Sequence, residues 1–232
     1  MSIKVVIGDV HGCYYTLKSL VKKVEKKYGE VSWFCTGDLV DRGKHSFQAV
    51  DYVISKGIKT VLGNHDYMFY TVMTDKTHPM TQTWFYNGAA STIKSYDGKQ
   101  SLLDEHLDFF GSLSLLYHTD EFLLSHAGIG EKLCATAEIS NTTIDEEKLT
   151  KAASKHLSAP FGILWNRERL CKFSIPQIVG HTGMHRVLFD DSTNSVYCDT
   201  YAVRGNALSA VIVSPEKGME VFVEETHKKD RI

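Results

Sequence analysis

The sequence IKVVIGDVHG, residues 3–12, joins a short apolar run to a turn that carries an acid and an imidazole. Residues 3–7 are mostly β-branched and the run stops at Gly8, a pattern that predicts a buried strand. Asp9 and His11 follow directly on this strand. The stretch therefore predicts a strand whose carboxyl end leads into a polar turn, and later segments of the chain repeat this arrangement.

Two more such strands follow, and an amphipathic helix separates each from the one before it. Apolar residues recur at helical spacing over 17–24 and over 47–54, and Gly29 closes the first of these helices. Apolar runs over 31–36 and 59–62 predict the second and third strands. The order strand, helix, strand, helix, strand is typical of βαβ units and predicts an α/β fold with a mostly parallel sheet.

The second half of the chain is more strand-like and less regular. A short helix is predicted at 68–73 and another within 102–116, and the polar segment 130–160 is predicted as a helical excursion over the surface. The further predicted strands are FLLSHA at 122–127, QIVGHT at 177–182, VYCDT at 196–200 and ALSAVIV at 207–213. Because no linker, repeat or low-complexity tract interrupts the chain, we expect residues 1–232 to form a single domain.

The composition is that of an ordinary globular protein, with 43% hydrophobic and 23% charged residues among 232. The formal net charge of −2 gives no broad basic field, so nucleic acid is not an expected partner. Five cysteines are scattered without a C-x-x-C pair, which favours a reducing compartment. No signal peptide opens the sequence and no run of ~20 apolar residues occurs, so we expect a cytoplasmic protein with no membrane partner.

Polar motifs stand at the carboxyl ends of the predicted strands. They are GDVHG at 8–12, GDLVDRG at 37–43, GNHD at 63–66, SHAG at 125–128 and GHT at 180–182. In open α/β sheets these strand ends form the crevice where ligands bind. We therefore expect one crevice lined by Asp9, His11, Asp38, Asn64, His126 and His181.

This set offers oxygen and imidazole nitrogen but no thiolate, which suits Mn²⁺, Fe or Zn²⁺. Six ligands are too many for one catalytic ion that keeps a coordination position open. The set suits two divalent ions ~3.5–4 Å apart that share a carboxylate. The sequence thus predicts a dinuclear metal site, with Mn²⁺ as the first expectation.

Each motif alone also has a structural explanation. Residues 41–43 could form a surface turn with an ion pair, Asn64-His65 could cap a helix, and His126 or His181 could be a hydrogen-bonded structural histidine. Their joint position at strand ends favours the metal site over these explanations. The histidines without this context are predicted to be surface or loop residues: His45, His78, His106, His118, His156, His185 and His227.

Taken in order, GDVHG, GDLVDRG, GNHD, HAG and GHT resemble the phosphoprotein phosphatase branch of the metallophosphoesterases, over about residues 7–213. The sequence is most similar to the small lambda-phage type of serine/threonine protein phosphatase, through WFYNG at 84–88 and LWNRER at 164–169. The segment CDTYAV at 198–203 is similar to the closing strand of that family, with Tyr201 in place of a glycine. The resemblance implies a calcineurin-like domain in which two mixed β-sheets pack face to face and are flanked by helices.

The resemblance also implies which residues would bind metal. Asp9 and His11 would bind the first ion, and Asp38 would bind both ions. The ligands implied for the second ion are Asn64, His126 and His181. The two ions would lower the pKa of a water between them, so that hydroxide attacks phosphorus near neutral pH.

Four further residues receive roles from the same resemblance. His65 would be the general acid that protonates the leaving oxygen, and Asp41 would orient it. Arg42 and Arg167 would bind the phosphate oxygens, because the planar guanidinium meets two oxygens at once.

One motif departs from the family pattern. Protein phosphatases of this family carry Arg-Gly-Asn-His-Glu where this chain has LGNHD at 62–66. That form, with GDVHGCY at 8–14, is similar to the symmetrical diadenosine tetraphosphate hydrolases. Arg204 and Arg169 are candidates to replace the arginine missing at Leu62, but long arginines are mostly exposed, and we favour surface ion pairs for both.

The leading hypothesis is a metal-dependent serine/threonine protein phosphatase that acts on a phosphorylated protein or peptide. The alternative is a hydrolase of dinucleoside polyphosphates, favoured by Leu62 and Asp66. The residues that favour the protein phosphatase are Trp84, Asn87, Trp165 and Arg167. A scaffold without catalysis is disfavoured because the candidate site is complete, and a nuclease is disfavoured because no basic, aromatic-laced groove is indicated.

Overall fold

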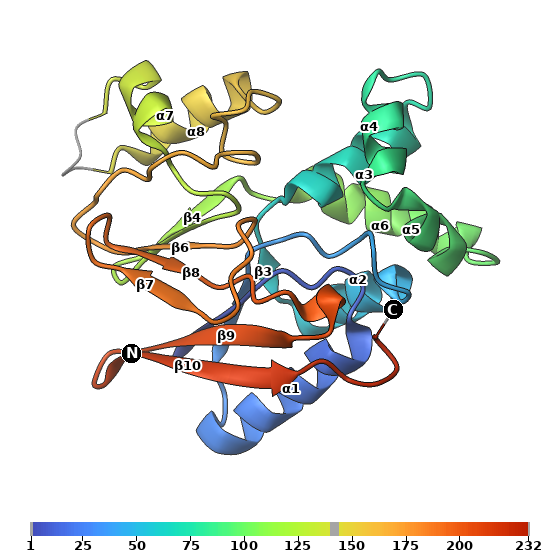
Figure 1. Ribbon diagram of the computed structural model, residues 1–232, viewed down its shortest axis with the longest axis horizontal. Helices are drawn as coiled ribbons and strands as arrows, with labels where there is room; N and C mark the ends of the chain where they lie inside the picture. The colour runs from blue at the N-terminus through green and yellow to red at the C-terminus, as the bar shows by residue number, and fades with distance from the viewer. Residues whose placement is uncertain (1, 140–143, 232) are drawn as a thin grey trace.

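The computed structural model describes residues 2–139 and 144–231, which form two mixed β-sheets packed face to face with helices on their outer sides (Figure 1). The predicted α/β architecture is confirmed. Among the described helices, none has both the length and the apolar character that crossing a bilayer requires.

The first sheet has the strand order β10-β9-β1-β2-β3. The pairs β1–β2 and β2–β3 are parallel, whereas β9 runs antiparallel to both β1 and β10. Its strands are β1 (Lys4–Ile7), β2 (Ser32–Cys35), β3 (Lys59–Thr60), β9 (Ala207–Ser214) and β10 (Gly218–Glu225). The chain therefore returns from its far end to complete the sheet in which it began.

The second sheet has the strand order β4-β5-β6-β8-β7. Its centre, β5–β6–β8, is parallel, and both edge strands are antiparallel to their neighbours. Its strands are β4 (Leu116–His118), β5 (Leu123–Ser125), β6 (Gln177–Val179), β7 (Leu188–Asp190) and β8 (Ser195–Tyr197).

The alternation of side chains along β1 explains why its apolar run is continuous. Val6 faces the core between the two sheets, where it meets Phe34 of β2 and Ile178 of β6. Val5 and Ile7 face the opposite way, into the core beneath the helices. Side chains of a strand alternate between its faces, so a strand covered on both sides needs an apolar residue at every position.

Helices cover both outer faces. The first sheet is covered by α1 (Tyr14–Tyr28) and α2 (Ser46–Lys56), with a group of helices, α3 to α6, beside them (Figure 1). That group consists of α3 (Asn64–Thr74), α4 (Met80–Tyr86), α5 (Ala89–Ser95) and α6 (Gln100–Ser112). The second sheet is covered by α7 (Glu131–Thr136) and α8 (Glu146–Lys155). Both fall in the predicted helical excursion, of which residues 140–143 lie outside the described part.

Some expectations were wrong in detail. The strand predicted over 59–62 is only two residues long. The helix predicted within 102–116 is α6, which ends at Ser112, and Leu116 starts β4. His106, predicted at the surface, is buried in α6, where its Nδ1 lies 2.8 Å from the Tyr96 hydroxyl. An apolar environment with one hydrogen-bonding partner makes this histidine a core residue.

Candidate metal and active site

The six residues predicted as metal ligands lie where strands end. Asp9 and His11 follow β1, Asp38 follows β2, and Asn64 begins α3 just after β3. His126 follows β5 and His181 follows β6, so both sheets contribute (Figure 1). All are buried except His181, which is partly exposed. The structure thus brings together residues up to 172 positions apart in sequence.

Asp38 lies in the middle of the group. Its Oδ2 is 3.5 Å from Nε2 of His11, and its Oδ1 is 3.5 Å from Nε2 of His126. The backbone N–H of His65 donates to Oδ1 at 2.9 Å and fixes the carboxylate. Two clusters of metal-capable atoms share Asp38: one with His11 and His65, the other with Asp9 and His126. The two carboxylate oxygens of Asp38 therefore face two different histidines.

Asn64 gathers the other histidines. Its Oδ1 is 2.9 Å from Nε2 of His126 and 2.9 Å from Nδ1 of His181. The Nδ1–H of His126 donates to the carbonyl oxygen of Thr36 at 2.7 Å, so in the neutral ring Nε2 carries a lone pair. The Nε2 lone pair and the Asn64 oxygen are both electron-rich and repel each other at this distance. A cation bound by both atoms would remove this repulsion. The His181 Nε2 is buried with no hydrogen-bonding partner among the described residues.

Arg42 supplies a positive charge at the same place. Its guanidinium nitrogens lie 2.7 Å from Nε2 of His11 and 2.7 Å from Nε2 of His65. Nδ1 of His11 lies 2.8 Å from the carbonyl oxygen of Val40 and donates to it, which leaves the lone pair on Nε2. The imidazole lone pairs therefore converge on a cationic group.

Burial is the main influence on the pKa values of the ionisable groups of the site. Burial, and the neighbouring Asp199 and Asp38, raise the pKa of Asp9, and burial together with Asp66 raises that of Asp38. Burial lowers the pKa of His181 to about 2. A divalent cation would favour both the charged carboxylates and the unprotonated imidazoles. The donor set therefore fits divalent metal ions.

His65 and Asp41 form a buried pair beside the metal-capable group. The Nδ1 of His65 lies 2.7 Å from Asp41 Oδ2. Trp84 Nε1–H donates to both carboxylate oxygens of Asp41 at 3.0 Å, and the Thr92 hydroxyl donates to Oδ1 at 2.8 Å. Burial raises the pKa of Asp41 to about 7, and burial together with the charge of Arg42 lowers the pKa of His65 well below its usual value.

The backbone of the site is held in an unusual conformation. Six residues of the site have a positive φ: His11, Asp38, Asp41, Arg42, His181 and Tyr201. Non-glycine residues adopt this left-handed region at a cost of order 1–3 kcal/mol each, and such residues cluster at functional sites. A side chain at Gly63 or Gly180 would overlap a carboxylate oxygen of Asp38 or Asp9 respectively. The close approach of the strand-end turns therefore requires glycine at these two positions.

A polar hollow of about 130 Å³ opens beside the metal-capable group. Three arginines line it, namely Arg42, Arg167 and Arg204, together with His11 and His181. The Arg204 guanidinium also stacks on the Tyr201 ring, 4.9 Å from its centroid. Arg204 is exposed, as predicted, but it lines the hollow and forms no ion pair among the described residues. Arg169 is largely exposed and pairs with Glu131 at 3.5 Å, and Leu62 packs in the core below the second sheet.

The sequence did not reveal the residues that position the site. The Thr36 hydroxyl donates to Asp9 Oδ1 at 2.6 Å. Asp66 accepts from the backbone N–H groups of Leu39 and Gly63, at 2.8 and 3.2 Å, and ties the turn after β2 to the start of α3. Thr92 lies 51 positions from its partner Asp41, and no local pattern marks such a contact. Trp84 stands in a motif that the sequence did indicate, but its role became visible only in the structure.

Residues 5–208 match the family model of the calcineurin-like phosphoesterases. The symmetrical bis(5'-nucleosyl)-tetraphosphatase of Vibrio parahaemolyticus serotype O3:K6 is 34% identical over 134 residues, which cover 53% of this chain and 44% of that enzyme. The match thus spans less than half the length of this curated relative.

Two solved structures share the fold over nearly the whole chain. A putative diadenosine tetraphosphatase has a TM-score of 0.62 at 20% identity and covers 96% of this chain and 94% of its own. A cold-active protein-tyrosine phosphatase of a psychrophilic Shewanella species has a TM-score of 0.65 at 18% identity. The match covers 98% of this chain and 81% of that phosphatase. At these identities the likeness concerns the fold alone.

Proposed function

Because the chain belongs to the calcineurin-like phosphoesterase family, whose members hydrolyse phosphoester bonds, we propose that it is a metal-dependent hydrolase of dinucleoside polyphosphates. We propose further that residues 1–232 act as one domain, an interpretation supported by the core that the two sheets share.

The position of Asp38 between His11 and His126, 3.5 Å from each, is the observation that carries the proposal. We assign Asp9, His11 and Asp38 to one divalent ion. The residues assigned to the second ion are Asp38, Asn64, His126 and His181. The oxygen and nitrogen donors suit Mn²⁺, Fe or Zn²⁺. Such a pair of ions, when bound, withdraws charge from phosphoryl oxygens and lowers the pKa of a water molecule.

In this proposal Arg42 and Arg167 bind the phosphoryl oxygens, and His65 gives its proton to the leaving oxygen. Arg42 donates to His65 Nε2 at 2.7 Å. A phosphate group that draws the guanidinium away frees Nε2 to hold a proton. Asp41 then stabilises the imidazolium through Nδ1, and Trp84 and Thr92 keep Asp41 in place.

Two observations support a polyphosphate as substrate. A curated relative that matches over 134 residues is a symmetrical bis(5'-nucleosyl)-tetraphosphatase, and the hollow is lined by Arg42, Arg167 and Arg204 together. A chain of phosphates can meet several guanidinium groups, whereas a single monoester phosphate leaves some unpaired. The leading hypothesis from the sequence, a serine/threonine protein phosphatase, becomes the second candidate.

One observation favours that second candidate. The hollow of about 130 Å³ is smaller than the ~300 Å³ at which small-molecule pockets begin, so it suits the entry of a single phosphoryl group from a peptide. Diadenosine tetraphosphate and a phosphoserine peptide, offered in parallel assays to the metal-loaded protein, separate the two candidates. A kcat/KM that favours the peptide would contradict the polyphosphate proposal.

Substitution of Arg204 by alanine tests the polyphosphate contact. We expect the KM for diadenosine tetraphosphate to rise about tenfold or more, because a charge-assisted hydrogen bond contributes ~1.5–3 kcal/mol. Arg169→Ala is the matched control and should leave this KM unchanged, since Arg169 pairs with Glu131 outside the hollow. Equal KM values for the two variants would show that Arg204 does not contact the substrate.

A further inference from the structure

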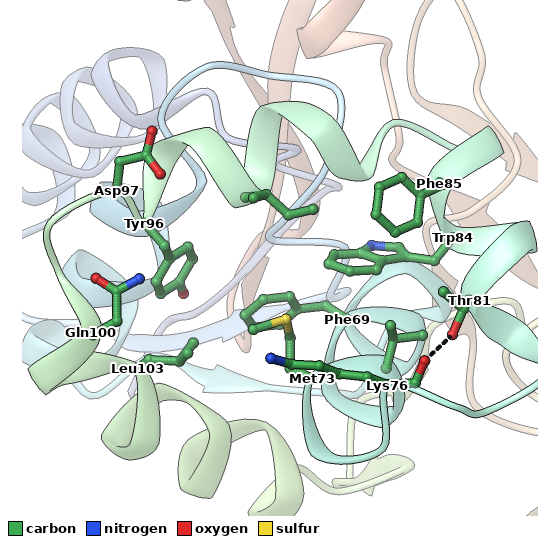
Figure 2. A pocket seen from close by; sticks show the side chains of 12 residues that line it. Phe69, Met73, Lys76, Thr81, Trp84, Phe85, Tyr96, Asp97, Gln100 and Leu103 are labelled. Atoms are coloured by element: carbon green, nitrogen blue, oxygen red, sulfur yellow. Dashed lines mark hydrogen bonds between the residues drawn. The ribbon is translucent and has the colours of Figure 1, made fainter.

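A pocket of about 410 Å³ lies among α3, α4, α5 and α6, and its wall includes Trp84, whose Nε1–H donates to Asp41 (Figure 2). Its wall includes Phe69, Met73, Trp84 and Tyr96, and Ile93 stands at its edge, 40% exposed. The volume falls in the range of small-molecule sites, which are mostly apolar with a few polar groups that orient the ligand.

The helices that form this pocket also hold the His65–Asp41 pair. Helix α3 carries His65 in its first turn and Phe69 one turn further on. Helix α4 carries Trp84, whose ring lines the pocket while Nε1–H donates to Asp41. Helix α5 carries Thr92, which bonds Asp41, and the next residue along lines the pocket.

Trp84 is the most direct link between the pocket and the His65–Asp41 pair. In Figure 2 its indole nitrogen points away from Phe69, whereas the face of the ring borders the pocket. The ring is 1% exposed and packs against Phe69 with centroids 5.8 Å apart. A molecule that fills the pocket therefore lies against the packed wall formed by Phe69 and Trp84, and the other edge of Trp84 fixes Asp41.

The polar groups of the pocket indicate the charge of its ligand. Lys76 extends its side chain along the pocket beside Met73, and within the described residues it forms no ion pair (Figure 2). The acidic residue of the lining, Asp97, lies at a different edge, near Tyr96. An ammonium group beside an apolar wall complements a molecule with one anionic group and an apolar body.

We propose that this pocket binds a small amphipathic anion, such as a medium-chain carboxylate, and that its occupancy changes hydrolysis through Trp84 and Asp41. The second half of this inference rests on the proposed function, because it concerns the catalytic role of His65. The ligand and the substrate would then occupy two different sites that share the same helices, which is the condition for allosteric coupling.

Binding is tested with decanoate, held below its micellar concentration, and with decanol as the uncharged counterpart. Titration calorimetry should show saturable decanoate binding. Lys76→Gln should weaken decanoate by up to about fivefold, as expected for loss of an ion pair with an exposed lysine, and affect decanol little. Lys94→Gln is the matched control, because Lys94 is exposed on α5 and does not line the pocket. Unsaturable binding, or equal weakening in both variants, would overturn the proposal.

A readout independent of hydrolysis comes from the indole N–H signals in a nitrogen–proton correlation spectrum. The chain has three tryptophans, and Trp84→Phe assigns the signal of interest. Decanoate should shift the Trp84 signal and leave those of Trp33 and Trp165 in place. A Trp84 signal that stays fixed at saturation, or equal shifts of all three signals, would overturn the proposal.

Coupling is tested by the rate. Saturating decanoate should change kcat for a substrate with a poor leaving group about fivefold or more, the lower end of typical allosteric effects, and change kcat for p-nitrophenyl phosphate less. An unchanged kcat with decanoate bound would overturn the coupling. Absence of any hydrolysis by the ligand-free, metal-loaded protein would instead contradict the proposed function, while calorimetry and the Trp84 signal still test the pocket.

Discussion

Asp38 lies between two groups of metal-capable residues, so one substitution tests both halves of the proposed site. We expect Asp38→Asn to lower the content of both metals and to abolish hydrolysis, because an amide lacks the charge and the second anionic oxygen of the carboxylate. Metal analysis of the purified variant and an assay with diadenosine tetraphosphate measure this. Asp51→Asn, an exposed carboxylate on α2, is the control. An Asp38→Asn protein with normal metal content and rate would refute the assignment.

Substitution of His65 distinguishes a role in proton transfer from a role in metal binding. In our proposal this histidine is the general acid and no metal ligand, so His65→Asn should keep both metals. The rate on substrates with poor leaving groups should fall ~10²–10⁴-fold. p-Nitrophenolate needs little protonation, so the loss on p-nitrophenyl phosphate should be smaller. Equal losses on the two kinds of substrate, measured at the same metal content, would argue against the acid role.

At the scale of elements, α1 shows how distant residues complete a local structure. Cys13 precedes the helix without a side-chain cap. Asp230 takes over this function: its carboxylate accepts from Thr16 N–H at 2.7 Å, from the Thr16 hydroxyl at 2.6 Å and from Tyr15 N–H at 3.3 Å. It thereby satisfies amide groups that the first turn of a helix leaves unpaired.

Asp230→Ala should therefore destabilise the protein by about 1.5–3 kcal/mol or more, because the buried N–H groups of the first turn of α1 lose a charged acceptor. Denaturant unfolding followed by circular dichroism measures the free energy of unfolding. Asp191→Ala, which removes an exposed carboxylate elsewhere, should change it little. Equal stability of the two variants would mean that water replaces the cap without cost.

The elements also mark how far the sequence predicts the structure. The strands that lead into the site were recognisable because each is a short apolar run that leads into a polar, glycine-containing motif. The edge strand β10 has alternating exposure and follows a turn with no apolar run, so the sequence indicated a strand there only weakly. The end of the helix predicted within 102–116 was not recognisable, because Leu113 to Leu116 continue the apolar composition after α6 ends at Ser112. Contacts such as Asp230 with α1 depend on tertiary structure and leave no local signal.

The whole molecule should respond to metal removal. Asp9 and Asp38 are buried, and their raised pKa values reflect the cost of charge without compensation. An ion at 100 times its Kd adds ~2.7 kcal/mol of stability. We therefore expect a chelator to lower Tm and Mn²⁺ to restore it, as measured by calorimetry. Asp38→Asn should show a much smaller response than Asp51→Asn. An unchanged Tm on loss of bound metal would contradict the assignment.

The pairing of β1 with β9 has a consequence for synthesis of the protein. Val6 pairs with Val211, so the strand that positions Asp9 and His11 waits for one that is translated about two hundred residues later. At ~5–20 residues per second this interval lasts roughly 10–40 s. During that time the nascent chain exposes an open strand edge of β1 and a metal site that is still incomplete. We therefore expect metal loading to be a late event, and we expect the emerging chain to be a client for a chaperone that shields open strand edges.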